Sequence, residues 1–308
     1  MREIRVLTGR TIKLYLKNPL SILFSFVYML LFMVLISVFL GDYMATAMKE
    51  LYVGVTGIDL SQIRWLVDTT SMAGVLMINC ILVPLNVFTI MVQDSGDHRL
   101  DSFLVSAASR GKLVFGYWLA PFCVGVVMNS IGLFVAEGFI VANGGTWLSV
   151  ESNLQMIGLI TANTFSSTSI FFVVAMLINK INLYSTFTGI MSAFVGFITG
   201  AFLPIGVFPE RIQKLFVLFP AHHGATMMRE IMTREPLAAT FSNVSDQTIK
   251  GVVMSAQEII ETYCTENGIT YLFGNTKVSF PLMLSVVIGS GVLFLAVSFF
   301  PMKRYVKE

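Results

Sequence analysis

Charged residues are scarce in this sequence of 308 residues. Asp, Glu, Lys and Arg make up 12% of it, whereas a soluble domain carries about 25%, and 55% of the residues are hydrophobic. A soluble core cannot hide so large an apolar fraction, so the composition predicts an integral membrane protein. The formal net charge is only +2 and no segment interleaves Lys or Arg with exposed aromatic residues, which argues against nucleic acid as a partner.

Cysteine is rare, and its placement excludes two kinds of site. Cys80 and Cys123 lie in apolar runs and Cys264 in a polar segment, with no CxxC pair among them. We therefore predict neither a disulfide framework nor a zinc site. The adjacent His222 and His223 would diverge by about 100° on a helix, so we expect external loop residues rather than metal ligands.

Long apolar runs dominate the sequence instead. A helix needs about 20 apolar residues to cross about 30 Å of hydrocarbon. Six runs are long enough, and the first has no cleavage site that would mark a signal peptide. We expect an all-α membrane protein that forms one domain over residues 1–308. The expected spans are residues 20–40, 71–92, 113–141, 156–178, 186–208 and 278–300.

Basic residues gather in alternate connecting segments, and this orients the bundle because cytoplasmic ends of spans retain Lys and Arg. The short segments on the other side hold only Lys49 and Arg64. Both termini are therefore expected in the cytoplasm. Residues 209–277 would then form an external segment of short re-entrant or capping helices, including a helical stretch over residues 252–263. The basic set is Arg2, Arg5, Arg10, Lys13, Lys17, Arg99, Arg110, Lys112, Lys180, Lys303, Arg304 and Lys307.

Residues 1–18 have the periodicity of an amphipathic helix that lies in the lipid headgroup region. The expected apolar side carries Ile4, Leu7, Leu14 and Tyr15, and the expected basic side carries Arg2, Arg10, Lys13 and Lys17. Pro19, directly after Asn18, should end this interfacial helix and turn the chain into the membrane. An ordinary juxtamembrane charge cluster is the alternative interpretation.

No energy source is visible in the sequence itself. The only Gly-Lys pair, Gly111-Lys112, is followed by Leu113 and so does not complete a P-loop. Five of the six expected spans contain no Asp, Glu, Lys, Arg or His, and the sixth contains only Glu137 near its end. Since ionisable groups mark proton and ion paths inside a membrane, we expect the driving force to arrive from outside the bilayer.

The loop at residues 93–112 is charged at its start and amphipathic after Arg99. Leu100, Phe103 and Leu104 stand at positions i, i+3 and i+4, which predicts a short helix with one apolar stripe. That stripe would face either a partner protein or the chain's own bundle.

This loop, with Ser109-Arg110-Gly111-Lys112 and the span that follows, resembles the signature region of type-2 ABC exporter permeases. A second match is the stretch from Leu203 to Pro220, in which two prolines flank a short amphipathic segment after the fifth span, followed by a helix with Arg229. Asn18-Pro19 before the first span also fits, so the resemblance covers most of the chain. Two features depart from the family pattern: several acidic residues could lead into the coupling helix, and the external segment at residues 232–276 is long.

The resemblance implies a permease that pairs with a second copy of itself or a homologous permease, in contact with membrane lipid. Its coupling helix and interfacial helix would rest on two ABC ATP-binding subunits, which would hold ATP and Mg²⁺, so the chain itself would be no enzyme and bind no cofactor. The implied contacts are Asp94, Asp97, Arg99, Leu100, Asp101, Phe103 and Leu104 in the coupling loop, with Arg10, Lys13 and Lys17 in the interfacial helix.

Two spans carry further candidate residues. Ser192, Gly196 and Gly200 recur every four residues and would let a neighbouring helix approach closely. The resemblance implies a dimer seam there, and packing within one protomer is the alternative. The fourth span is rich in Ser, Thr and Asn, including Asn163, Ser166 and Ser167, which should face a translocation path or make interhelical hydrogen bonds.

The leading functional hypothesis is therefore the membrane subunit of an ABC exporter in a bacterial plasma membrane. Its expected cargo is amphipathic or lipid-like, such as a drug, antibiotic, peptide or lipid. Export of a polysaccharide or of sodium is the alternative within the family. A partner-independent secondary carrier or a receptor-like membrane protein is the alternative from another class.

Overall fold

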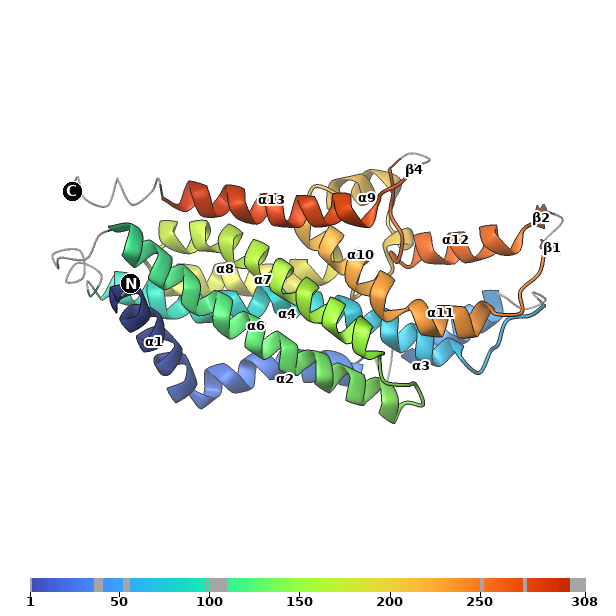
Figure 1. Cartoon of the computed structure of the whole chain (residues 1–308), viewed down its shortest axis with the longest axis horizontal. Helices are drawn as coiled ribbons and strands as arrows, with labels where there is room; N and C mark the ends of the chain where they lie inside the picture. The colour runs from blue at the N-terminus through green and yellow to red at the C-terminus, as the bar shows by residue number, and fades with distance from the viewer. Residues whose placement is uncertain are drawn as a thin grey trace.

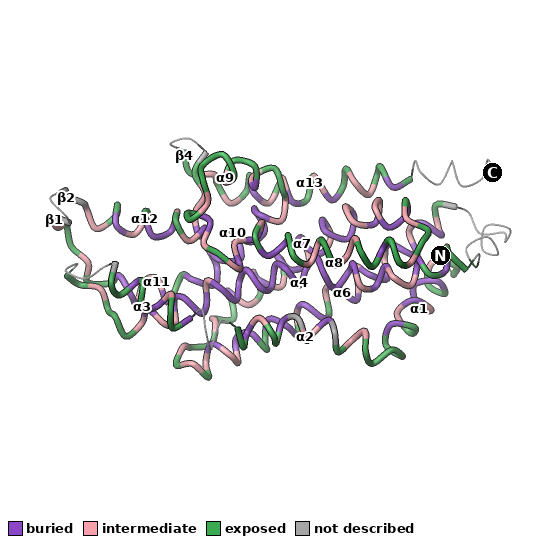
Figure 2. The backbone as a smooth tube through the Cα atoms, turned by 180° about the vertical axis from the view of Figure 1, so that it is seen from behind, coloured by how far each residue is buried: buried purple, intermediate pink, exposed green. Residues whose placement is uncertain are grey.

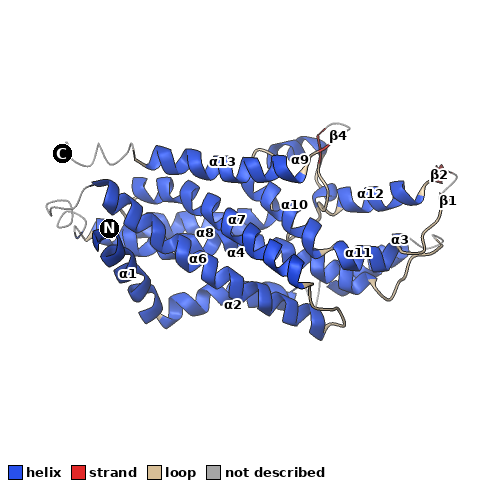
Figure 3. Cartoon of the chain, viewed as in Figure 1, coloured by secondary structure: helices blue, strands red, loops and turns tan. Residues whose placement is uncertain are grey.

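The computed structural model describes residues 2–35, 41–51, 56–97, 99, 110–249, 252–273 and 276–299. Helices make up nearly all of this part of the chain (Figure 3). The helices are α1 (Arg2–Lys17), α2 (Pro19–Leu35), α3 (Gly41–Leu51), α4 (Ile63–Gly96), α6 (Arg110–Ala142), α7 (Val150–Leu177), α8 (Ile181–Ile198), η2 (Ile205–Val207), α9 (Glu210–Phe216), α10 (Pro220–Met232), α11 (Arg234–Phe241), α12 (Ala256–Glu266) and α13 (Phe280–Ser298). The strands are β1 (Gln247–Ile249), β2 (Val252–Met254), β3 (Leu272–Phe273) and β4 (Thr276–Lys277), paired antiparallel as β1 with β2 and β3 with β4.

The long helices run along one axis and give the molecule two distinct ends (Figure 1). We call one the α1 end, where α1 and α6 begin and α4 and α13 finish. The other is the α12 end, which holds α3, α11 and α12. The described basic residues of α1, together with Arg99, Arg110, Lys112 and Lys180, lie at the α1 end, so the positive-inside rule predicts that this end is cytoplasmic.

Five helices are long and apolar enough to cross a membrane: α4, α6, α7, α8 and α13. The pair α1 and α2, bent by 82°, forms a sixth candidate if it is counted as one span. The prediction of an all-α, multi-pass membrane protein is confirmed. Several predicted boundaries are wrong, however, and the largest errors are at α4, which begins at Ile63 rather than residue 71, and at α8, which ends at Ile198 rather than residue 208.

Local chemistry explains both boundary errors. Arg64 and Asp68 pair within the first turns of α4, with 2.8 Å between Nε and Oδ2, so a stretch too polar for a hydropathy window still continues the helix. At the other boundary Gly200 adopts φ +65°, the left-handed conformation that commonly ends helices. Pro204 follows shortly afterwards, where the chain has already left the helix.

Helix α4 is the centre of the bundle, and buried residues concentrate along it (Figure 2). A helix that is apolar on all sides is expected to lie inside a larger bundle. Pro84 lies within α4 at a contact with both α6 and α7. A Cβ added at Gly125 of α6 would lie 3.1 Å from Pro84 Cγ and 2.6 Å from Thr164 Cγ2 of α7, so this three-helix contact needs glycine.

Helix α1 packs against the bundle through a face that partly matches the predicted one, since Leu7 and Tyr15 are buried as expected. Leu7, Thr8, Thr11 and Tyr15 are buried, and the Thr8 hydroxyl donates a hydrogen bond to the carbonyl of Gly116 in α6 at 3.2 Å. Leu14, expected on the apolar side, is 39% exposed. The break at Asn18 lies where Pro19 predicts it.

A second, smaller core forms the α12 end. Ile63 and Leu66 of α4 pack there with Phe241 of α11 and with Ile259 and Tyr263 of α12. Helix α12 begins with a capping box in which Ser255 and Glu258 satisfy each other's backbone amides. The helical stretch predicted over residues 252–263 is therefore partly wrong, since residues 252–254 are strand β2.

Helix α10 bears on the prediction that residues 209–277 form short re-entrant or capping helices, because it packs within the bundle and does not cap it. It lies inside the bundle against α4, α7 and α13, and most of its residues are buried. His222 and His223, expected as loop residues, lie in α10 with 1% and 5% of their surface exposed. A 13-residue helix with two His and one Arg has the sequence of a surface helix, which is why composition alone misplaces it.

Candidate functional site

The α1 end is fastened by a buried carboxylate. Asp94, in the last turn of α4, accepts hydrogen bonds from Nη1 and Nη2 of Arg10 at 2.6 and 3.0 Å. The Tyr117 hydroxyl of α6 donates to the same carboxylate at 3.0 Å. A two-pronged Arg–carboxylate contact fixes both partners in orientation. Three helices that are distant in sequence are therefore joined at one side chain.

Further ion pairs surround this cluster. Arg99 lies 3.3 Å from Asp97 and 3.8 Å from Asp94, with 61% of its side chain exposed. The Lys112 ammonium, at the start of α6, lies 2.8 Å from the Glu3 carboxylate of α1. We call the contacts of Asp94 with Arg10 and Tyr117 the joint, and the exposed ion pairs around it the rim. The α1 end thus has a buried joint and an exposed, charged rim.

The sequence prediction for this region is corrected at one residue. Asp94 was expected to contact an ATPase subunit directly, but its side chain is 2% exposed and faces the bundle. Asp97 and Arg99 are exposed, as are Lys13 and Lys17 of α1, and their predicted contacts stay predictions. Leu100, Asp101, Phe103 and Leu104, the other predicted contacts, lie outside the described residues.

The polar residues of α7 face the protein interior. Asn163, Ser166 and Ser167 are 1%, 2% and 4% exposed. The Ser166 and Ser290 hydroxyls lie 2.9 Å apart and link α7 to α13, which is the interhelical hydrogen bond that was one of the two predicted roles. Asn163 Nδ2 donates to the Leu159 carbonyl, while its Oδ1 has no hydrogen-bond partner among the described residues. The translocation path stays a prediction.

The predicted small-residue stripe of α8 is interrupted. Gly200 lies beyond the end of the helix, and the Phe202 ring folds back onto Gly196, so that a Cβ there would lie 2.2 Å from Phe202 Cζ. Gly196 therefore packs within the protomer. Ser192 is half-buried and donates to the Thr188 carbonyl. The dimer seam stays a prediction, and on α8 the side chains left exposed for it are larger ones such as Ile190 and Phe194.

Sequence reasoning placed Arg229 in a helix but missed that its side chain is buried inside the bundle. Arg229 of α10 is fully buried, and it donates from Nη2 to the Thr199 carbonyl at 2.5 Å and from Nε to the Thr70 carbonyl of α4 at 3.3 Å. Its Nη1 has no partner, and none of the ion pairs found among the described residues includes it. The only signal was an Arg within a helix that also carries several apolar residues.

Two further carboxylates are buried near the α12 end. Asp68 of α4 and Glu137 of α6 are 0% and 1% exposed, and each has one oxygen without a hydrogen-bond partner in the described part of the chain. The expectation that ionisable groups are nearly absent from the bundle is therefore too strong. Asp68 was missed because it lies before the predicted start of its span.

Metal binding finds no support at these positions. Within the described ranges, no group of three or more His, Cys, Asp and Glu residues is arranged to hold a metal ion.

The family comparison agrees with this architecture. The family model described as ABC-2 type transporter matches residues 2–233, which include α1, the coupling region and α10. No curated protein matches the chain closely enough to serve as a relative. Members of the matched family are membrane permeases that normally pair with an ATP-binding subunit. The chain belongs to the ABC-2 type transporter family.

Proposed function

We propose that this chain is the membrane subunit of an ATP-driven exporter, with ATP and Mg²⁺ bound by a separate ATPase subunit. The observation that carries the proposal is the joint at Asp94. Asp94 lies within the predicted coupling loop at residues 93–112, and it holds Arg10 and Tyr117 to the same point. A force applied to that segment would therefore act on α1, α4 and α6 together.

Helix α4 can transmit such a force across the bundle. Its 34 residues span about 50 Å at 1.5 Å per residue. Asp94 lies near one end, and Thr70, whose carbonyl accepts a hydrogen bond from Arg229, lies near the other. A rigid element that contacts both regions is the physical link that coupling between distant sites requires.

For the complete exporter we propose two permease copies in a bacterial plasma membrane, with an amphipathic or lipid-like cargo. The exposed apolar side chains of α8, among them Leu183, Ile190 and Phe194, offer a surface for the second copy. The sequence has 26 Phe and 18 Met, which supply adaptable apolar contacts for such a cargo.

Copurification with the coexpressed ATP-binding subunit tests the proposal. We expect the triple change Arg99→Ala, Asp101→Ala and Phe103→Ala to release the ATPase subunit. The matched control is Lys277→Ala, which removes an exposed charge at the α12 end and should leave the complex intact. Survival of the complex after the triple change would show that the coupling helix is misplaced.

A transport assay separates the exporter from a secondary carrier. Buried Asp68 and Glu137 are the groups that an ion-driven carrier would use. We expect reconstituted complexes to need ATP and to keep working when the ion gradient is dissipated. Transport by the permease alone, driven by a proton or sodium gradient, would refute the exporter proposal.

A further inference from the structure

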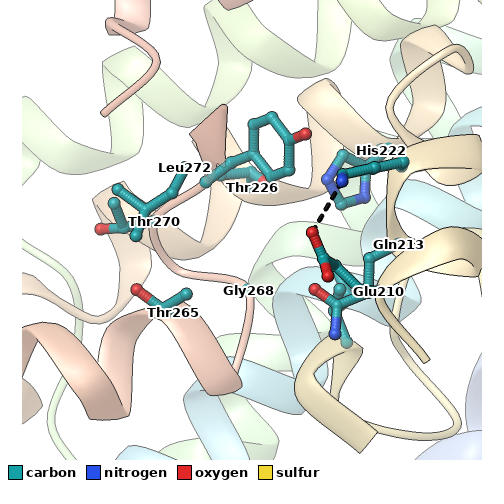
Figure 4. A pocket seen from close by; sticks show the side chains of 11 residues that line it. Glu210, Gln213, His222, Thr226, Thr265, Gly268, Thr270 and Leu272 are labelled. Carbon is teal, nitrogen blue, oxygen red and sulfur yellow. Dashed lines mark ion pairs between the residues drawn. The ribbon is translucent and has the colours of Figure 1, made fainter. Parts of the chain in front are cut away.

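A pocket of about 500 Å³ opens near the α12 end, between α9, α10 and the chain that joins α12 to β3 (Figure 4). Glu210 and Lys214 of α9 line it on one side, and Thr265 and Thr270 on the other. Its volume falls within the range of pockets that hold drug-sized ligands, about 300 to 1,000 Å³.

The inner wall of the pocket carries buried polar groups without partners. His222 and Thr226 of α10 both line the pocket, and they are 1% and 0% exposed. The Thr226 hydroxyl has no hydrogen-bond partner among the described residues, and the His222 ring, which has the Ile198 carbonyl as a polar neighbour, meets full hydrogen-bond geometry with none of them. Buried polar groups in proteins are nearly always hydrogen-bonded, so this pair calls for a ligand or ordered water.

Positive charge lies directly behind this wall. Gly268, another lining residue, adopts φ +66°, and a Cβ placed there would lie 3.3 Å from Arg229 Nη1. The same Cβ would lie 2.7 Å from Ile205 Cδ1, so the glycine lets the pocket wall lie close to both the guanidinium and the Ile205 side chain. Because Nη1 has no partner and the ion pairs of the described chain leave Arg229 out, its charge is not neutralised locally.

The rim adds a second cation with its own counter-ion. The Lys214 ammonium lies 2.6 Å from the Glu210 carboxylate, the ion pair that is dashed in Figure 4. This contact lowers the pKa of Glu210 and raises that of Lys214, so both are charged near neutral pH. The two side chains are 80% and 65% exposed, so an incoming anion could compete for Lys214.

The geometry points to a binding site for an organic oxyanion, with a phosphate or carboxylate group held between Thr226, His222 and Lys214 in the field of Arg229. The pocket is larger than such a group alone, and Ile205, Tyr271 and Leu272 provide apolar surface for the body that carries it. A neutral polyol would satisfy the two buried partners but would leave the positive charge uncompensated.

Calorimetric titration of the full chain in phosphatidylcholine nanodiscs tests the site. Dihexanoyl phosphatidate is the anionic probe, dihexanoyl phosphatidylcholine the probe without net charge, and glycerol 3-phosphate the probe without acyl chains. We expect saturable binding of phosphatidate, weakened about tenfold by Lys214→Met and severalfold by Thr226→Val, since a charge-assisted contact contributes more than a neutral one. Arg211→Met is the matched control, because Arg211 is an exposed cation of the same helix that does not line the pocket.

The relative affinities of the three probes distinguish the possible sources of the anion. Tighter binding of phosphatidate than of glycerol 3-phosphate identifies a lipid as the source of the anion, and equal affinities identify a free phosphate ester. Equal binding of phosphatidylcholine and phosphatidate would overturn the proposal, as would unchanged affinity in both Lys214→Met and Thr226→Val. No ATPase subunit takes part in this measurement, so its failure would leave the exporter proposal standing.

Discussion

Two buried charged residues mark opposite ends of α4 and differ in their surroundings. Asp94 belongs to the last turn of α4, and Arg229 of α10 contacts the carbonyl of Thr70 near the other end. Asp94 accepts three hydrogen bonds, two from Arg10 and one from Tyr117. Arg229 donates to two backbone carbonyls, has an unpartnered Nη1 and lacks an ion pair within the described ranges. The first charge is compensated and the second is not.

This difference in compensation implies different roles for the two residues: Asp94 holds helices together, and Arg229 lies beside a binding region. A compensated buried charge holds its partners in one arrangement, and breaking it is costly because the remaining groups cannot regain water. A buried charge without a counter-ion, by contrast, raises the free energy of the folded protein. Binding of a ligand or a change of packing can then lower that free energy. We therefore infer that the α1 end moves as a unit, and that the region around α10 responds to what binds there.

The largest expected effect comes from Asp94→Asn. Asn keeps the size of the side chain but removes the charge that Arg10 and Tyr117 approach, and we expect a loss of about 3 kcal/mol in the free energy of unfolding. Reversible unfolding in mixed micelles measures it.

Asp97→Asn is the control, since Asp97 lies three residues further on with 57% of its side chain exposed. It should change the same free energy by less than about 0.5 kcal/mol. If the two variants were equally stable, Asp94 would not be the joint.

Arg229→Met should have a smaller effect despite the complete burial of the residue. The substitution loses the hydrogen bonds to Thr70 and Thr199, but it also removes the cost of burying an unpaired charge, so we expect a net loss below about 1.5 kcal/mol. The same unfolding experiment measures it. A loss as large as that of Asp94→Asn would mean that Arg229 is fully compensated, and the comparison would fail.

Much of the fold could be predicted from the sequence, because hydropathy and helix-ending residues act locally. Apolar runs revealed the spans, and Asn18-Pro19 revealed where α1 gives way to α2. The joint could not be predicted in the same way. Arg10 and Asp94 are separated by 84 positions, and no local pattern shows that a carboxylate in a charged loop will turn inward to meet an arginine of the first helix.

The region around Arg229 was hidden for a different reason. The burial of α10 depends on α4, α7 and α13 leaving room for it, which is a property of packing rather than of its own 13 residues. The early end of α8 was hidden in a similar way. It depends on the positive φ of Gly200 and on the contact of the Phe202 ring with Gly196, and neither can be seen in the sequence. Spacing every four residues predicted a continuous stripe where the chain in fact turns.

Removing one hydroxyl at each end should change stability in opposite directions. Tyr117→Phe deletes a donor to Asp94 and should cost about 1 kcal/mol, because the carboxylate loses a hydrogen bond while buried. Thr226→Val deletes a hydroxyl that has no hydrogen-bond partner among the described residues, and it should be neutral or stabilise the protein by up to about 1 kcal/mol. Unfolding free energies of both variants give the comparison directly. A cost for Thr226→Val equal to that for Tyr117→Phe would indicate that ordered water already satisfies the α10 hydroxyl.

The smallest expected effect concerns one exposed ion pair at each end. Lys112 pairs with Glu3 at the α1 end, and Lys214 pairs with Glu210 near the α12 end, at 2.8 and 2.6 Å. Solvent screens both, so Lys112→Met and Lys214→Met should each change the free energy of unfolding by less than about 0.5 kcal/mol, and raising the salt concentration should remove the difference from the parent protein. If both variants change the free energy of unfolding by the same small amount, the difference expected between Asp94→Asn and Arg229→Met is due to burial and pairing of the charges. If Lys112→Met alone lowered the free energy of unfolding strongly, the exposed Lys112–Glu3 ion pair would also help to hold α1 against α6. These helices would then be held together at the α1 end by this ion pair as well as by the contacts of Asp94.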